Sequence, residues 1–246
     1  MTMFVPLGAL CRTSHQIKFH ASALGNDALP PSLPFDWTIT SFSALTTVLH
    51  PEFDPKSVLT ETECSIAFSG AVQCDKTGLI FHHDLPPSLF EPSGGPQPYD
   101  KVPEDLARTG PFNDARARFL HTFAHLQGVK AQTDCPIFVR WMSFGHPEKR
   151  FPALFAGESP QALYTALLGF MGGLPFRLLV VTTKIVPRDA AKPPALIVSD
   201  PDQSNIATCL LYEWRGWNGD GTDDYRGDEE SWGQMLRRAI DHWPLT

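Results

Sequence analysis

The chain has 246 residues, 42% of them hydrophobic and 19% charged, so it can bury a core of its own and differs from a disordered polypeptide. Its formal charge is −7, and no segment concentrates lysine and arginine, which argues against a nucleic-acid partner. No apolar run approaches the length of about 20 residues that crosses a bilayer, so no membrane partner is expected.

Cysteine usage and the first residues bear on the compartment. The five cysteines form an odd set without a CxxC pair, which favours a reducing environment and argues against a disulfide framework. The amino terminus lacks the basic leader and small-residue cleavage site of a secretory signal, and the bulky Leu10 before Cys11 argues against a lipoprotein box. We therefore expect a cytoplasmic protein.

The first predicted elements are a strand, a turn and two helices. Residues 3–7 are apolar and end at Gly8, and residues 11–24 carry apolar side chains at helical spacing. Prolines at 30, 31 and 34 stop that helix. A hydroxyl residue among 40–43 is expected to cap a short second helix that runs through Leu49.

The middle of the chain is predicted to hold a hairpin, a long loop and a helix. Residues 64–83 are rich in β-formers around a polar tetrad at 75–78, a pattern typical of a hairpin. Residues 86–111 hold seven prolines, which predicts a loop rather than a domain linker. A helix is then expected from Asn113 or Asp114 to Gly128.

Strands and helices alternate in the rest of the chain. Strands are expected at residues 137–141, 178–183, 196–198 and 208–214, and helices at 160–172, capped by Ser159, and 229–242. This alternation predicts a single α/β domain over residues 1–246, with a mostly parallel sheet flanked by helices. The hairpin is expected as an antiparallel addition, and the strand at 208–214 as a second one.

Cys11 is the first candidate for chemistry. In an open α/β sheet, ligands gather beyond the carboxyl ends of the strands, and Cys11 follows the first strand and begins the first helix. Unpaired N–H groups and the helix dipole favour a thiolate there, which would make Cys11 a nucleophile. The alternative is a small buried hydrophobe, because free cysteines are among the most buried residues. The other four cysteines are weaker candidates, since three lie in strand-like runs and Cys135 precedes a proline.

A thiol nucleophile needs a base, and His82 and His83 are the most concentrated histidines. Adjacent residues of a strand point to opposite faces, so only one of the two could meet Cys11. His15, one helical turn after Cys11, and His146, beyond the strand at 137–141, are weaker candidates.

Three carboxylates could orient the base. Asp36 lies between two aromatic residues, so it is expected to be half buried and to need a donor, either an imidazole or the backbone of a turn. Asp200 ends a predicted strand but precedes a proline, as turn residues commonly do. Asp84 is the third option.

Patterns typical of metal and cofactor sites are weak in this sequence. His82, His83 and Asp84 are residue types that bind zinc or iron, but neighbouring strand residues diverge. His121 and His125 have helical i, i+4 spacing without a carboxylate. There is no phosphate loop, dinucleotide fingerprint, EF-hand spacing or GxSxG elbow. Neither a metal nor another cofactor is expected.

Several motifs together resemble a known family. They are LGxxC at residues 7–11, PFDW at 34–37, FHH at 81–83, a helix with arginines at 116 and 118, and FVR at 138–140. In this order they resemble a domain-of-unknown-function family described as papain-like cysteine peptidases. The resemblance covers about residues 4–141, with Pro6 where serine is common in that family.

The resemblance implies that Cys11 is a nucleophile, that His82 or His83 is its base, and that Asp36 is the accompanying acid. It also offers a papain-like α+β fold as an alternative, in which the cysteine helix precedes a mostly antiparallel sheet. A strand precedes Cys11 here, so the α/β expectation is preferred. A strand-turn-helix hydrolase with cysteine in place of serine would satisfy both observations.

The expected function is therefore a thiol-dependent hydrolase or acyltransferase acting on a peptide, acyl or glycan-linked substrate. One alternative is a non-catalytic carbohydrate- or peptide-binding module whose groove is lined by Trp37, Trp141, Trp214 and Trp217. Another is a metal-dependent hydrolase using His82, His83 and Asp84. The sequence does not select the substrate or an oligomeric state.

Overall fold

The structure is a computed structural model. It describes residues 3–9, 11–24, 31–60, 64–67, 71–85, 101–102, 104–142, 157–187, 191–214 and 227–243.

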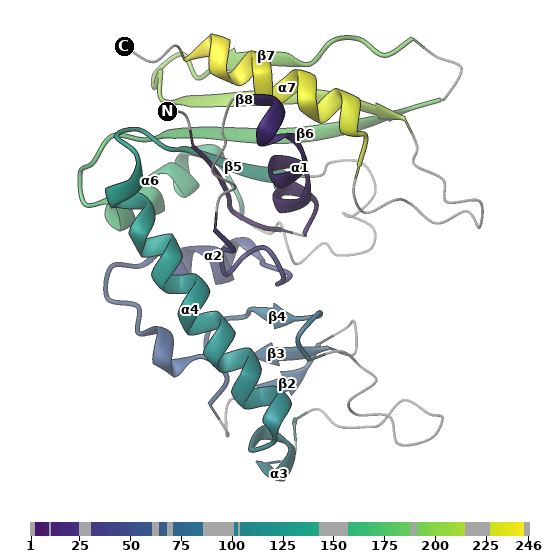
Figure 1. The fold of residues 1–246 in the computed structure, drawn as a ribbon. Helices are drawn as coiled ribbons and strands as arrows, with labels where there is room; N and C mark the ends of the chain where they lie inside the picture. The colour runs from purple at the N-terminus through teal and green to yellow at the C-terminus, as the bar shows by residue number, and fades with distance from the viewer. Residues whose placement is uncertain are drawn as a thin grey trace.

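Five strands form the larger sheet, in the order β1, β5, β6, β8, β7. Their bounds are β1 (Phe4–Pro6), β5 (Ile137–Met142), β6 (Arg177–Val186), β7 (Leu196–Ser199) and β8 (Ile206–Trp214). The strands β1, β5, β6 and β8 run parallel, and β7 pairs antiparallel with β8. The expected α/β class with a mostly parallel sheet is confirmed, rather than the papain-like α+β alternative (Figure 1).

Helices cover both faces of this sheet. The α-helices of the described residues are α1 (Arg12–His20), α2 (Phe42–Leu49), α3 (Glu104–Ala107), α4 (Gly110–Gln132), α6 (Pro160–Met171) and α7 (Glu229–His242). On β5, Val139 and Trp141 join a buried cluster with α1 and α7, whereas Phe138 joins another with α2, α4 and α6. Because both faces are buried, these strands are almost continuously apolar in sequence.

A second, antiparallel sheet contains β2 (Cys64–Ile66), β3 (Val72–Cys74) and β4 (Ile80–Phe81). The turn between β3 and β4 occupies the expected tetrad, and Gly78 supplies the positive φ of +74°. The helix α4 lies along this sheet and extends to the larger one (Figure 1). Phe81 of β4 packs against Phe119 of α4 at 6.1 Å between ring centroids. One buried cluster includes Phe81 and Phe138, so the two sheets share a core.

Local signals placed several helix ends correctly. The side chain of Ser41 accepts a hydrogen bond from the Ala44 N–H at the start of α2. Ser159 does the same for Ala162 at the start of α6, which ends at Gly172 in the left-handed conformation, φ +63°. Such side chains satisfy N–H groups that the helix itself leaves free.

One strand direction was predicted wrongly. The strand that contains Thr208 is parallel to β6, and β7 is the antiparallel member of the larger sheet. Only residues 200–205 join β7 to β8, and so short a connection allows only an antiparallel neighbour. The chain therefore reverses at β7 and returns to the parallel direction in β8.

The loop and helix boundaries around residue 110 also differ from expectation. Residues 86–100 lie outside the described part, but Glu104–Ala107, inside the expected loop, is helical. The next helix begins at Gly110, because Pro111 falls in its first turn, where no N–H is needed. It continues past Gly128 to Gln132, since burial of side chains on both sides of that glycine outweighs its low helix propensity. Among the described helices, none has the length and apolar character needed to cross a membrane.

The cap of α6 gives a direct test of these local signals. Replacing Ser159 by Ala removes the acceptor for the Ala162 N–H, and we expect a loss of about 1 kcal/mol in the free energy of unfolding. Thr165→Ala, on the exposed face of the same helix, should change it by no more than about 0.5 kcal/mol. Urea denaturation measures both, and equal effects would contradict the assignment of the cap.

Candidate functional site

The turn after β1 presents Cys11. Gly8 and Ala9 both adopt the left-handed conformation, with φ of +74° and +73°, which is uncommon for alanine. Cys11 then occupies the N-cap position of α1, and its carbonyl accepts the His15 N–H at 2.9 Å. Cys11 therefore lies at the carboxyl end of a parallel strand and at a helix start, as expected. Backbone strain of this kind is often retained where a side chain must be held for chemistry.

The Cys11 thiol is partly exposed, unlike the buried thiols of Cys64, Cys74 and Cys209. Desolvation by burial raises the pKa of Cys11, although a hydrogen bond from its own N–H and the charge of Arg12 lower it in part. Burial raises the pKa of Cys209 to about 12. The Cys11 thiol is therefore mainly protonated at neutral pH and needs a base to become a nucleophile.

Arg12 fixes the start of α1 against the larger sheet. Its guanidinium lies 2.9 Å from Oε2 of Glu213 on β8 and stacks on the Trp141 ring, 4.7 Å from the centroid. Glu213 is 1% exposed, and its second oxygen accepts the Trp232 Nε1–H at 2.8 Å. This buried carboxylate is satisfied on both oxygens and holds the residue next to Cys11 in place.

A fully buried ion pair anchors the turn before Cys11. Nε of Arg140 lies 2.6 Å from Oε1 of Glu158, and neither side chain is exposed. The same guanidinium donates to the carbonyl of Leu7 at 2.9 Å and to that of Thr40 at 3.1 Å. Arg140 thus joins the end of β1 to the residues that follow the PFDW motif.

Sequence reasoning missed the role of this pair. Only the resemblance points to Arg140, and no sequence pattern points to Glu158. The available signal was an arginine within the apolar run of β5, since an arginine in a buried strand requires a partner. No spacing in the sequence identifies Glu158 as that partner.

Asp36 is more deeply buried than expected, at 2% exposure. One oxygen, Oδ2, accepts the Leu33 N–H at 3.0 Å and lies 2.5 Å from Nζ of Lys18 on α1. Its other oxygen, Oδ1, is buried without a hydrogen-bond partner. Asp36 is thus bound by a lysine and a turn N–H, and no described histidine reaches it. Lys18, seven residues after Cys11 on the same helix face, was missed by sequence reasoning.

His82 and His83 do not lie on a strand, which corrects the expectation that they point to opposite faces. The strand β4 ends at Phe81, and a hydrogen bond from the Leu85 N–H to the Phe81 carbonyl, 3.0 Å, closes a turn over the histidines. Both side chains are exposed, and their ring centroids are 5.4 Å apart. The turn thus presents both imidazoles together.

The immediate neighbours of His83 affect its protonation. Its ring meets the Trp37 ring edge to face, 5.5 Å between centroids. Burial, with a smaller contribution from the charge of His82, lowers the pKa of His83, so its imidazole is neutral at pH 7 and can accept a proton. Asp84 is ion-paired with Arg118 of α4, and burial raises the pKa of this carboxyl despite that pair.

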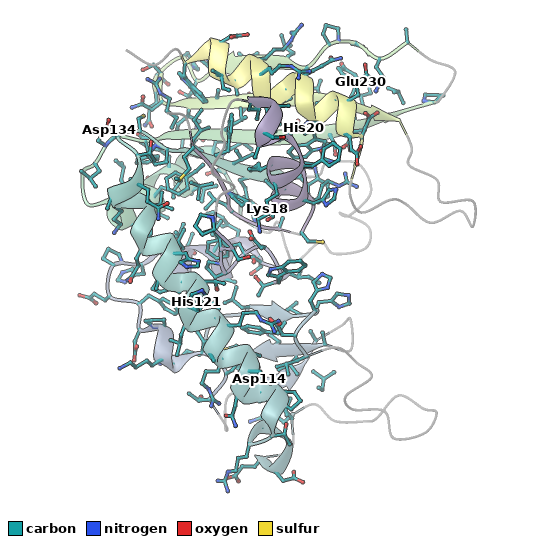
Figure 2. The ribbon with its side chains drawn as sticks, viewed as in Figure 1. Lys18, His20, Asp114, His121, Asp134 and Glu230 are labelled. Carbon is teal, nitrogen blue, oxygen red and sulfur yellow. The ribbon has the colours of Figure 1, made fainter. Side chains whose placement is uncertain are left out.

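The three motifs meet around residues 33–40. The Thr40 N–H donates to the Ala9 carbonyl at 3.2 Å, next to the Cys11 turn. The Ile39 backbone exchanges two hydrogen bonds with Ile80 of β4, three residues before His83. The Trp37 ring lies 6.0 Å from Nζ of Lys18, a residue that Figure 2 labels on α1. Residues 37–40 thus contact the turn before Cys11, the strand β4 and the histidine turn.

The other candidate bases and acids have separate roles. His15 is partly buried and stacks on Phe19 at 6.1 Å between centroids. Asp200 accepts the N–H groups of Asp202 and Gln203, so it caps a turn. His146 lies outside the described residues.

The described residues offer little that could ligate a metal ion. The described residues contain no group of three or more His, Cys, Asp or Glu side chains placed to hold a metal ion. His121 and His125 of α4 contact each other at 4.3 Å between centroids, and the Ser32 carbonyl lies 3.0 Å from Nδ1 of His125.

The tryptophans of the expected binding groove are divided. Trp37 is 44% exposed, whereas Trp141 is 2% exposed and donates to Thr183 Oγ1 at 3.2 Å. Trp214 ends β8, and Trp217 lies outside the described residues. Trp37 alone of these is shown exposed.

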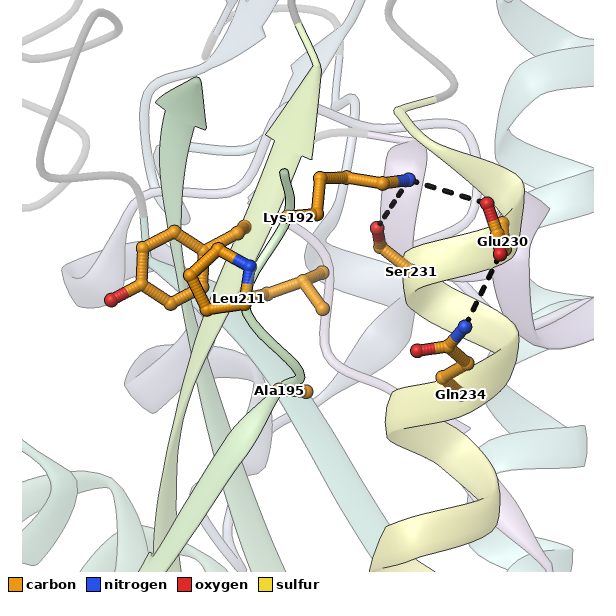
Figure 3. A pocket seen from close by; sticks show the side chains of 8 residues that line it. Lys192, Ala195, Leu211, Glu230, Ser231 and Gln234 are labelled. Atoms are coloured by element: carbon orange, nitrogen blue, oxygen red, sulfur yellow. Dashed lines mark hydrogen bonds and ion pairs between the residues drawn. The ribbon is translucent and has the colours of Figure 1, made fainter. Parts of the chain in front are cut away.

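A separate hollow of about 190 Å³ lies between β8 and the start of α7 (Figure 3). Its cation, Lys192, is bound by Asp228 at 2.7 Å and by Ser231 at 3.2 Å. The lining contains neither a cysteine nor a histidine. The hollow is therefore a weaker candidate for nucleophilic chemistry than the Cys11 region.

Comparisons with protein-family models, curated proteins and solved structures found no match to this chain. Its function is therefore inferred from its own residues and their arrangement.

The buried pair of Arg140 and Glu158 should be essential for stability. Arg140→Met leaves a buried carboxylate and two carbonyls without their donor, and we expect a loss of roughly 3–5 kcal/mol in the free energy of unfolding. Adding Glu158→Leu should restore part of that loss, because the isolated charge is removed. Arg108→Met, in the exposed pair with Glu104, should cost about 1 kcal/mol or less. Urea denaturation measures the free energy of unfolding of each variant. Similar losses in Arg140→Met and Arg108→Met would contradict this interpretation.

The raised pKa of Cys11 predicts how its alkylation depends on pH. The rate of iodoacetamide labelling at Cys11 should rise with pH. The midpoint of this rise should lie at a higher pH in the folded protein than in the urea-unfolded chain, because burial disfavours the thiolate. Peptide mapping by mass spectrometry measures the rate at Cys11 separately from the other cysteines. A lower midpoint in the folded protein would mean that the thiolate is already stabilised at rest.

Proposed function

We propose that this chain is a thiol-dependent hydrolase or acyltransferase in which Cys11 is the nucleophile. The observation that carries the proposal is the meeting of the Cys11 turn, Trp37 and the His82–His83 turn around residues 33–40. The partly exposed thiol and the strained turn before it support the same reading.

In the proposed reaction, the Cys11 sulfur attacks a carbonyl carbon as its proton passes to an imidazole of His82 or His83. The carbonyl oxygen becomes an oxyanion, and in this proposal backbone N–H groups of the first turn of α1 stabilise it. The imidazolium then protonates the leaving group, which departs from an acyl-cysteine. Water or another acceptor releases the acyl group and the free thiol.

His83 is the better candidate for the base. Its pKa is lowered, so the ring is neutral at pH 7, and its contact with Trp37 joins it to the segment beside the Cys11 turn. Asp36 is assigned as a positioning residue. By holding Lys18 and the Leu33 N–H, it fixes the turn that carries Trp37.

The proposed substrates are peptide, acyl or glycan-linked carbonyl compounds. The odd set of five cysteines supports action in the cytoplasm. The alternative of a carbohydrate- or peptide-binding module rests on the exposed Trp37, since Trp141 is buried. The alternative of a metal site at His82, His83 and Asp84 is weakened by the ion pair between Asp84 and Arg118.

A panel of ester, thioester, peptide and isopeptide substrates tests the proposal on the purified chain. We expect turnover of at least one class, with an acyl adduct on the Cys11 peptide, and loss of both in Cys11→Ser. The matched control is Cys135→Ser, which removes the other partly exposed thiol and should retain turnover. Full turnover in Cys11→Ser, or equal loss in both variants, would count against the proposal.

The base is distinguished by His83→Gln and His82→Gln. Loss of the general base should reduce kcat about 10²–10⁴-fold, with the larger loss in His83→Gln.

Metal analysis and Trp37→Ala examine the alternatives in the same preparation. Stoichiometric zinc or iron would favour the metal-dependent hydrolase. Binding of a peptide or glycan that needs Trp37 and is unaffected by Cys11→Ser would favour the binding module.

A further inference from the structure

Two cysteines outside the candidate site face each other across the small sheet. In the antiparallel pairing of β2 with β3, Cys64 is directly opposite Cys74. Both side chains are in the same buried cluster, at 2% and 0% exposure, so both lie on the core side of the sheet. They are separate thiols in the structure, and the Cys64 sulfur lies 3.5 Å from the Thr60 carbonyl.

The hydrogen bonds around the two residues establish the type of pair. The Cys74 N–H donates to Leu79 at 2.9 Å and the Cys74 carbonyl accepts from Gly78 at 2.7 Å, so its backbone points away from β2. The Cys64 carbonyl accepts the Val102 N–H at 3.0 Å on the other side. Cys64 and Cys74 therefore form a non-hydrogen-bonded antiparallel pair, in which the side chains are closest.

This geometry suits a disulfide. Cα atoms in such a pair are about 4.5 Å apart, within the range of about 4.4–6.8 Å found for disulfides. Cys209 is a contrasting buried strand cysteine, since its partners in the sheet are Val181 and Ile197. Neither neighbour can form a disulfide with it.

We propose that Cys64 and Cys74 form a reversible disulfide when the protein meets a low-molecular-weight disulfide such as oxidised glutathione. One cysteine thiolate attacks the small disulfide, breaks its S–S bond and releases one small thiol. The second cysteine attacks the resulting mixed disulfide, so that the protein S–S bond forms and a second small thiol leaves. Two protein thiols are oxidised, one small disulfide is reduced, and the two protons leave with the products.

The disulfide staples β2 to the central strand of the sheet whose third strand leads into the His82–His83 turn. Cross-linking also restricts the unfolded chain, so the oxidised protein is more resistant to denaturation. The sequence does not predict this pair, because its five cysteines include no CxxC motif. Only the strand register brings Cys64 and Cys74 together.

The test equilibrates the full chain with mixtures of reduced and oxidised glutathione (GSH and GSSG) in two sets of samples. In one set the protein is refolded in the glutathione mixture, and in the other it is kept unfolded in urea. After acid quenching and alkylation, peptide mapping measures the fraction of chains with a Cys64–Cys74 link. We expect the folded protein to be half-oxidised at a ratio of [GSH]² to [GSSG] at least about thirtyfold higher than the ratio that half-oxidises the chain in urea. The reason is that a disulfide that fits the native geometry favours the native state. Cys209 should remain a thiol in the folded samples, where it is buried, and dithiothreitol should reverse the link.

Three variants complete the test. Cys64→Ala and Cys74→Ala should each abolish the intrachain link and the rise in denaturation midpoint on oxidation, whereas Cys11→Ser should retain both. The proposal would be overturned if the folded protein were half-oxidised only at a ratio of [GSH]² to [GSSG] equal to or lower than that required in urea. So would glutathione adducts confined to Cys11 and Cys135 while Cys64 and Cys74 stay alkylatable. These results do not depend on turnover, so they are independent of the proposed hydrolase activity.

Discussion

The arrangement around Cys11 depends on the buried ion pair between Arg140 and Glu158. A guanidinium without solvent is stable only when its charge and its N–H groups are satisfied, and here a carboxylate and two carbonyls meet that need. Those carbonyls belong to Leu7, before the cysteine turn, and Thr40, after the PFDW segment. One side chain from β5 thus sets the relative position of two segments 33 residues apart in the chain.

Two further ion pairs orient α1, a helix with few apolar residues. Arg12 reaches Glu213 on β8, and Lys18 reaches Asp36 beside Trp37. Both carboxylates are almost fully buried, so each strongly requires its cation. The helix is held by charge at both ends, and the Cys11 thiol lies at its start. Because burial raises the pKa of that thiol, the proposed chemistry requires a base, and the lowered pKa of His83 leaves its imidazole neutral at pH 7.

Local sequence patterns predicted most of the elements because their causes are local. Ser159 and Gly172 bound α6 through caps that involve only neighbouring residues. Strand order and direction depend on connections and on partners distant in sequence, which explains the error over the strand containing Thr208. The histidines were misplaced for a related reason, since the short β4 ends where a turn bond to Phe81 becomes available.

For the candidate site, residue chemistry and spacing pointed to Cys11, His82 and His83 and placed Cys11 between a strand and a helix, whereas Asp36 was preferred over Asp200 and Asp84 only through the resemblance. The interaction partners of Asp36, Arg140 and Cys64 came only from the tertiary structure. Lys18 rather than a histidine binds Asp36, Glu158 binds Arg140, and Cys64 faces Cys74. Helix caps and apolar periodicity arise from interactions within a few residues. Ion pairs and strand register join residues far apart, whose distance depends on how the whole chain packs.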